Sequence, residues 1–94
     1  DEAAQAKFLT TASKPILEDF LRGFRDLPSL EESHQRELIE GLAGNHGKKL
    51  VEIIQPILVS QYGTTVTPGI FEVIDILGRT AVETRIQRAI DSIQ

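Results

Sequence analysis

The chain has 94 residues, of which 40% are hydrophobic and 26% are charged, and its formal net charge is −4. This length and composition predict one globular domain over residues 1–94 and exclude a disordered chain. The absence of cysteine excludes disulfides, thiol nucleophiles and thiolate metal sites. Acidic residues outnumber basic ones, which disfavours electrostatic binding to nucleic acid or anionic lipid.

Methionine is absent as well, which predicts that the chain is a processed product or an excised domain. Residues 1–6 are then expected to be a boundary or a flexible tail. No basic and apolar leader segment is present, and no run of about twenty apolar residues predicts a membrane span. These features leave the compartment open, with the cytoplasm favoured.

Helical signals dominate the first third of the chain. A first helix is predicted over residues 2–11, and a second should begin with Ser13 as N-cap and Pro15 in its first turn. The second helix should reach Asp26, because its apolar residues recur on one helical stripe. Gly23 lies inside it and is expected to mark a close contact with another helix. The stripe consists of Ile16, Leu17, Phe20, Leu21, Phe24 and Leu27.

Two further helices are predicted in the middle of the chain. Ser29 and Glu32 have the spacing of a capping box, so a third helix should begin there and run to about Ala43, before the glycine-rich turn at 44–47. A fourth helix is predicted over residues 48–62, and Pro56 is expected to kink or split it. The β-branched residues of 57–62 leave a strand as the alternative there.

The last quarter of the chain predicts either one long helix or two shorter ones. Thr67 and Pro68 form a start signal, and a break at Gly78 is indicated because Thr80 and Glu83 form a second capping box. Five or six short helices joined by short loops predict an all-α fold, a compact single-domain bundle.

The segment Ile53–Phe71 departs most sharply from the average composition, because its nineteen residues carry no charge. It is predicted to be either core or an apolar surface for a partner. The second interpretation adds a short C-terminal seam with the spacing of coiled-coil core positions. The interface candidates are Ile57, Tyr62, Val66, Ile70, Phe71, Val82, Ile86 and Ile93.

The two histidines are candidates for metal or phosphate chemistry. Glu31 and His34 have the spacing of a di-iron ligand pair, but the second pair that such a site needs is missing, so no metal is expected. The glycine spacing of 41–47, around His46, is similar to that of histidine phosphotransfer domains. This resemblance implies a small helical phosphotransfer bundle, although Glu37 stands where that family carries its phosphorylated histidine.

No motif for catalysis or cofactor binding is present, since the chain has neither a nucleophile elbow nor a phosphate-binding glycine loop. The chain is therefore predicted not to be an enzyme and to need no cofactor. Its predicted function is that of a protein-interaction or regulatory module, which docks its apolar helical surface onto another protein or onto a second copy as a homodimer.

Nucleic acid is not expected as a partner, because aromatic and basic residues are not interleaved along the sequence. Two alternatives remain open. One is a histidine-based phosphotransfer or sensor domain that uses His46 or His34. The other is a helical nucleic-acid-binding domain that binds DNA through Lys48, Lys49 and Arg85.

Overall fold

The computed structural model describes residues 2–63 and 69–93, and these residues form five α-helices with no strand among them. The helices are α1 (Glu2–Phe8), α2 (Lys14–Arg25), α3 (Glu32–His46), α4 (Leu50–Tyr62) and α5 (Ile70–Ser92). The all-α prediction is confirmed. The strand alternative is wrong, since α4 runs through Pro56 as one helix to Tyr62. Across the described residues, no helix combines the length and the hydrophobicity that a bilayer span requires.

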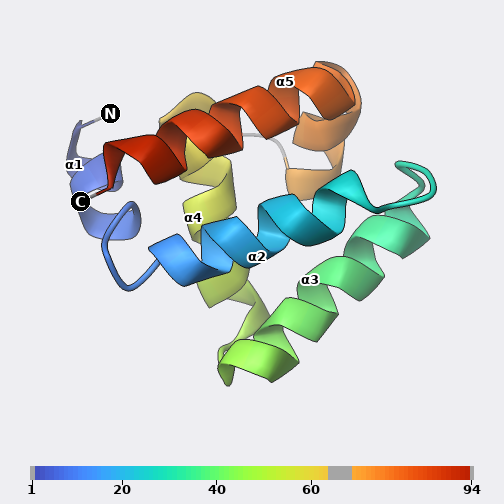
Figure 1. The fold of residues 1–94 in the computed structure, drawn as a ribbon, viewed down its shortest axis with the longest axis horizontal. Coiled ribbons are helices and arrows are strands. Elements are labelled where there is room, and N and C mark those ends of the chain that lie inside the picture. Colours follow the sequence, from blue (N-terminus) through green and yellow to red (C-terminus); the bar gives the residue numbers. More distant parts are fainter. Residues whose placement is uncertain (1, 64–68, 94) are drawn as a thin grey trace.

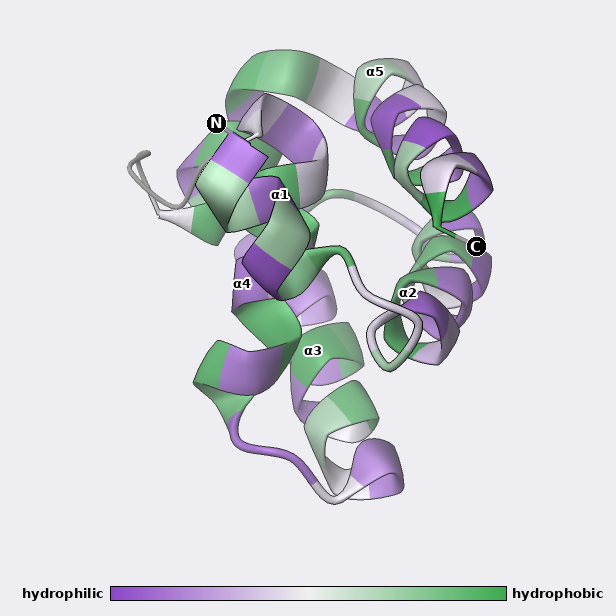
Figure 2. Cartoon of the chain, turned by 90° about the vertical axis from the view of Figure 1, so that its left-hand side faces the viewer, coloured by the Kyte–Doolittle hydropathy of each residue, from purple (hydrophilic) through white to green (hydrophobic). Residues whose placement is uncertain are grey.

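The helices pack as a bundle around α2, α4 and α5 (Figure 1). The long helix α5 packs along α4 and α2, α3 lies against α2 and α4, and α1 contacts α4. In Figure 2, α2 turns its hydrophobic residues toward the other helices and its hydrophilic residues outward, as its apolar stripe predicts. The expected close contact at Gly23 is confirmed, because a Cβ atom there would collide with Leu38 Cδ1 of α3.

Aliphatic side chains make up most of the core, since the sequence has few aromatic residues. Phe20 and Phe24 on α2 are the aromatic members, and their buried rings stack with centroids 5.3 Å apart. The uncharged segment contributes through α4, where Ile53 and Ile57 are fully buried. Much of that segment is therefore core.

The helix starts differ from the predicted capping pattern. The Ser13 hydroxyl makes no cap bond to α2 and instead lies 3.2 Å from Thr10 Oγ1. Ser29 does not cap α3 either, because its hydroxyl bonds His34 Nδ1 at 2.7 Å and accepts the Glu31 amide at 3.2 Å. Ser13 is the N-cap residue of α2 with Pro15 in the first turn, as predicted, but it lacks the expected side-chain bond. The cap prediction at Ser29 is wrong, because Glu31 is the N-cap residue of α3 and the Ser29 hydroxyl bonds other polar groups.

The break at Gly78 divides α5 into two helical halves. Gly78 has φ 82° and ψ 167°, a backbone conformation that residues with a Cβ atom avoid, so the alternative of one unbroken helix is wrong. The next residue, Arg79, donates from its guanidinium to the carbonyl oxygens of Phe24 at 2.7 Å and Leu27 at 2.9 Å. These bonds tie the second half of α5 to the end of α2 and satisfy carbonyl groups that a helix terminus leaves open.

A Gly78→Ala substitution should lower the free energy of unfolding by about 1–3 kcal/mol, the usual cost of forcing an L residue into this region. Gly41→Ala is the matched control, because Gly41 is exposed inside α3 and a Cβ atom there meets nothing within 4 Å. That control should raise the free energy of unfolding by about 0.5–1 kcal/mol. Urea denaturation followed by circular dichroism measures both, and equal effects would contradict a special conformation at Gly78.

Candidate functional site

Tyr62 and Phe71 are the members of the predicted interface that reach the surface. Tyr62 is 39% exposed at the end of α4, and Phe71 is half-buried in the first turn of α5. Val66 lies outside the described residues. The remaining candidates are buried in the core of this chain, so they stabilise the fold and present no surface to a partner; they are Ile57, Ile70, Val82, Ile86 and Ile93.

An arginine from α5 covers the ring of Tyr62. The Arg85 guanidinium carbon lies 5.6 Å from the ring centroid, and Nη1 donates to the carbonyl oxygen of Gln61 at 2.7 Å. Gly63, with φ 73°, ends α4 directly after Tyr62. The hydrogen bond fixes the cation beside the exposed aromatic ring at the helix terminus.

A second aromatic–arginine pair lies at the start of α5. The Arg36 guanidinium carbon of α3 lies 4.8 Å from the centroid of the Phe71 ring, within the range of a cation–π contact. Arg36 also bonds Glu32 at 2.5 Å, and its side chain remains 52% exposed. Tyr62 and Phe71 stand on either side of residues 64–68 in the chain, so each end of that segment carries such a pair.

Such pairs can stack a planar ligand. Nucleic-acid bases stack on aromatic rings and on guanidinium planes, and each stacked base contributes about 1–3 kcal/mol. Sequence reasoning looked for aromatic and basic residues close together in the chain and so missed these pairs. The fold assembles them from separate helices: Tyr62 of α4 with Arg85 of α5, and Phe71 of α5 with Arg36 of α3.

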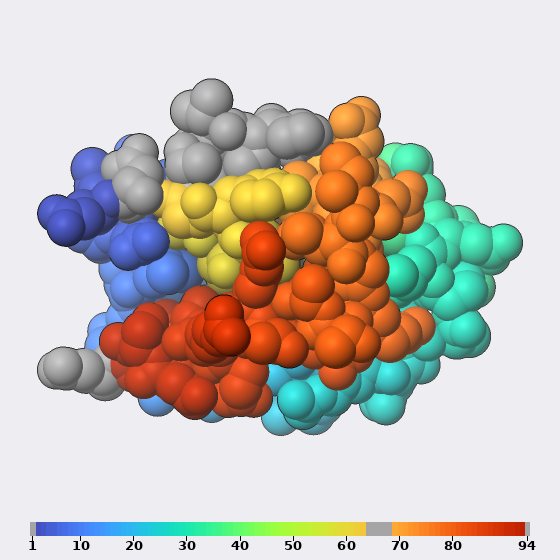
Figure 3. All heavy atoms as spheres, turned by 90° about the horizontal axis from the view of Figure 1, so that it is seen from above, coloured from blue at the N-terminus to red at the C-terminus, as the bar shows by residue number. Residues whose placement is uncertain are grey.

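A groove of about 480 Å³ runs beside Tyr62, between the end of α4, the second half of α5 and α1. We call it the α4–α5 groove. These three elements meet on the face seen in Figure 3. Among the described residues no acidic side chain lines the groove, while two arginines do. The lining residues are Gln5, Leu9, Val59, Ser60, Gln61, Tyr62, Gly63, Arg85, Arg88, Ala89 and Ser92.

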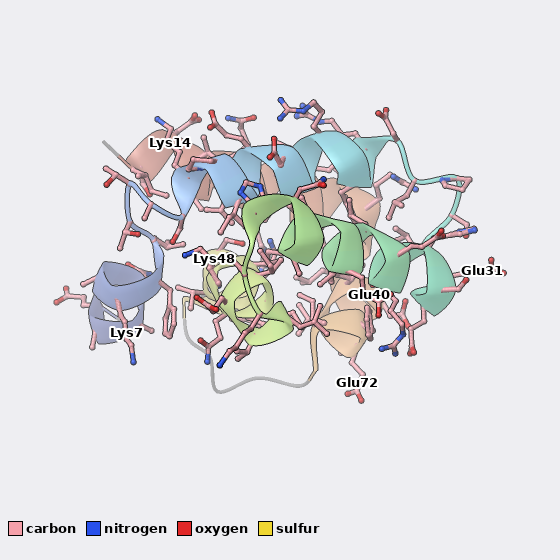
Figure 4. The ribbon with its side chains drawn as sticks, turned by 90° about the horizontal axis from the view of Figure 1, so that it is seen from below. Lys7, Lys14, Glu31, Glu40, Lys48 and Glu72 are labelled. Atoms are coloured by element: carbon pink, nitrogen blue, oxygen red, sulfur yellow. The ribbon has the colours of Figure 1, made fainter. Side chains whose placement is uncertain are left out.

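The six charged residues labelled in Figure 4 lie toward different ends of the molecule according to their sign. The labelled cations Lys7, Lys14 and Lys48 lie toward the end that carries α1, whereas the labelled acids Glu31, Glu40 and Glu72 lie toward the opposite end. The net charge of −4 averages over this arrangement. A local surface that accepts an anion is therefore compatible with an acidic chain.

The histidines are engaged in structural contacts. His46 lies in the last turn of α3, where its Nε2 is 2.8 Å from Asp19 Oδ2 of α2, and its side chain is only 19% exposed. His34 Nδ1 lies 2.7 Å from the Ser29 hydroxyl and 3.9 Å from Glu31 Oε2. Within the described part of the chain, no group of three possible ligands could hold a metal ion.

The basic patch of the DNA-binding alternative is not assembled. Lys48 and Lys49 precede the first residue of α4, and Lys48 pairs with Glu52 at 3.9 Å. Arg85 bonds Gln61 at the other end of the same helix. The three cations therefore lie at opposite ends of α4.

Comparison with known proteins finds one family and a set of relatives. A family model described as an anticodon binding domain matches residues 1–90. The chain is 38% identical over 94 residues to a glutamate–tRNA ligase of Desulfosudis oleivorans, covering 100% of this chain and 20% of the relative. It is also 38% identical over 93 residues to that of Syntrophobacter fumaroxidans, and 33% identical over 90 residues to that of Anaeromyxobacter sp. strain K. Each of these two alignments covers 96% of this chain and 19% of the relative.

These matches overturn the predicted function. A protein-interaction or regulatory module, acting on another protein or as a homodimer, is wrong, and so is the exclusion of nucleic acid as a partner. The net charge gave a wrong prediction because it averages over the whole surface. The lack of alternating aromatic and basic residues along the sequence also gave a wrong prediction, because the fold pairs residues that are distant in the chain. Neither alternative matches exactly. The phosphotransfer domain is not supported by the family, and the nucleic-acid-binding alternative agrees with the family in its class but not in its expected DNA target.

The expectation that the chain is not an enzyme agrees in its coarse form with the family, whose description names a binding domain. The relatives are ligases, and the chain spans about a fifth of their length. With residues 1–90 matched by the family model and 38% identity across the whole chain to one relative, the chain belongs to the anticodon-binding domain family.

Proposed function

We propose that this chain binds the anticodon of a tRNA and forms the anticodon-binding part of a glutamate–tRNA ligase. The family match over residues 1–90 carries the proposal, and the relatives supply the ligase. On this proposal the 94 residues bind RNA without catalysing a reaction. The ligation chemistry belongs to the rest of a longer parent enzyme, which works in the cytoplasm.

The two aromatic–arginine pairs support base binding. Anticodon bases are unpaired, and unpaired bases are recognised by stacking together with hydrogen bonds to their edges. Tyr62 and Phe71 offer aromatic faces on either side of residues 64–68 in the chain, each beside an arginine. Stacking draws on the π-face of a base, so it needs no positive net charge on the domain.

Binding of short RNA hairpins tests this proposal. One hairpin carries a glutamate anticodon loop, and the control has the same stem with the three anticodon bases replaced. Fluorescence anisotropy with the 94-residue chain should show tighter binding of the first hairpin by at least about fivefold, since a well-placed base contact contributes about 1–3 kcal/mol of discrimination. Equal affinity for both hairpins would overturn anticodon recognition by this chain.

A further inference from the structure

Gln61, one of the residues that line the α4–α5 groove, has a buried acceptor atom without a partner. Gln61 is 4% exposed, and its amide nitrogen donates to Ser60 Oγ at 3.0 Å and to the Val82 carbonyl oxygen at 3.4 Å. Its Oε1 atom has no hydrogen-bond partner among the described residues. A buried polar atom left unpaired usually costs about 1–3 kcal/mol, so an incoming donor is favoured at this position. Gln61 lines the groove together with Ser60.

The same groove contains a cation that no carboxylate neutralises. Arg88 is exposed on α5 and makes no ion pair with any described residue, although Glu83 and Asp91 line the adjacent groove on its other side. Arg85 differs from it, because its guanidinium is held by Gln61 and lies over Tyr62. Arg88 is therefore the cation available to an anion that enters the α4–α5 groove.

Three kinds of residue line the groove: Gln61, whose buried acceptor lacks a donor; Arg88, which has no ion pair with a described residue; and the aromatic Tyr62. A ribose phosphate offers complementary groups, since its phosphate is an anion and its 2′-hydroxyl can donate to Oε1 of Gln61. The groove volume of about 480 Å³ lies in the range of small-ligand sites.

We propose that the α4–α5 groove binds one ribose-phosphate unit of the tRNA backbone independently of base sequence, with its phosphate at Arg88 and its 2′-hydroxyl on Gln61. The proposal rests on the proposed function for the identity of the RNA. It assigns the groove a different task from anticodon reading: phosphate contacts position the strand, whereas base contacts specify the sequence. Dependence on the 2′-hydroxyl would also let the site tell RNA from DNA.

Arg88→Gln tests the phosphate contact. We expect a shallower slope of log affinity against log salt concentration for binding to the glutamate-anticodon hairpin. The slope should change by about 0.7, the value for one phosphate contact on a single strand. The affinity ratio between the two hairpins should stay the same. Arg22→Gln is the matched control, since Arg22 is 71% exposed on α2, pairs with Asp19 and does not line this groove. An unchanged slope in Arg88→Gln would overturn the proposal.

Gln61→Leu tests the ribose contact, with a hairpin whose loop nucleotides lack the 2′-hydroxyl. The parent chain should prefer the ribose loop by about 2–10-fold, the usual worth of one hydrogen bond, and Gln61→Leu should abolish that preference. An equal preference in both proteins would overturn the contact. Thermal unfolding of the variant checks that it remains folded.

The two proposals can fail separately. If the parent chain binds both hairpins equally and Arg88→Gln makes the salt dependence shallower, the results support the backbone site and refute anticodon recognition. If the parent chain distinguishes the hairpins and the variants change neither the salt dependence nor the ribose preference, the results support anticodon recognition and refute the backbone site.

Discussion

Replacing Phe24 with alanine is expected to lower the free energy of unfolding by about 3–5 kcal/mol, the usual cost of removing a fully buried phenyl ring. Phe24 has 0% exposure, stacks on Phe20 and lies under the Arg79 guanidinium at 5.5 Å. The cavity would open at the junction of α2 with the second half of α5, where Arg79 also bonds the Phe24 carbonyl oxygen. For a domain with a total stability of about 5–15 kcal/mol, this is a large fraction.

Urea denaturation followed by circular dichroism measures the loss. Ile76→Ala is the control, because Ile76 is a large apolar residue on the same bundle but is 69% exposed. Its effect should stay within about 0.5 kcal/mol, as is usual for surface positions. A Phe24→Ala variant no less stable than Ile76→Ala would mean that the α2–α5 junction does not hold the bundle together.

Phe71→Leu is expected to weaken binding of the glutamate-anticodon hairpin by roughly 5–150-fold, which corresponds to the 1–3 kcal/mol of one base stacked on an aromatic ring. Leucine fills the half-buried side of the position, where Phe71 packs against the core, but it removes the flat face and the contact with Arg36. Stability should therefore change by less than about 1.5 kcal/mol. Anisotropy titration and urea denaturation of the same preparation separate the two effects.

Phe8→Leu is the matched control for that substitution. Phe8 is also half-buried and also has a cation over its ring, with Lys7 Nζ 5.2 Å from the centroid, but it lies on α1 and belongs to neither aromatic–arginine pair. Its hairpin affinity should equal that of the parent chain. If Phe71→Leu and Phe8→Leu bind RNA equally well, the Phe71–Arg36 pair is not a stacking platform.

The helical framework could be predicted because its causes are local. The apolar stripe of α2 follows the helical period, and Gly63 and Gly78 mark an end and a break where the backbone takes positive φ. Ser13 was correctly predicted as the N-cap residue of α2, but its hydroxyl and that of Ser29 bond other polar groups than the helix amides expected. The partner that a hydroxyl bonds depends on side-chain positions that a spacing rule does not contain.

Only part of the candidate site could be predicted from the sequence. Tyr62 and Phe71 could be selected because they belong to the uncharged segment, but five buried residues were selected with them. Apolar composition marks a side chain for burial without saying whether its own chain or a partner covers it. The arginines that accompany the two rings come from other helices, so only the fold shows the pairs.

The most direct test of RNA binding by this acidic domain is a map of the contact surface by nuclear magnetic resonance. The isotope-labelled chain is titrated with the glutamate-anticodon hairpin, and shifts are followed for each backbone amide. We expect the largest shifts around Tyr62, Gly63, Phe71 and Arg88, and on α3 around Arg36. The exposed side of α2 around Glu18 and Arg22, which belongs to neither pair nor to the groove, should change little. Shifts centred on α2 near Glu18, or no shifts at saturating RNA, would contradict an anticodon interface built on the two aromatic–arginine pairs.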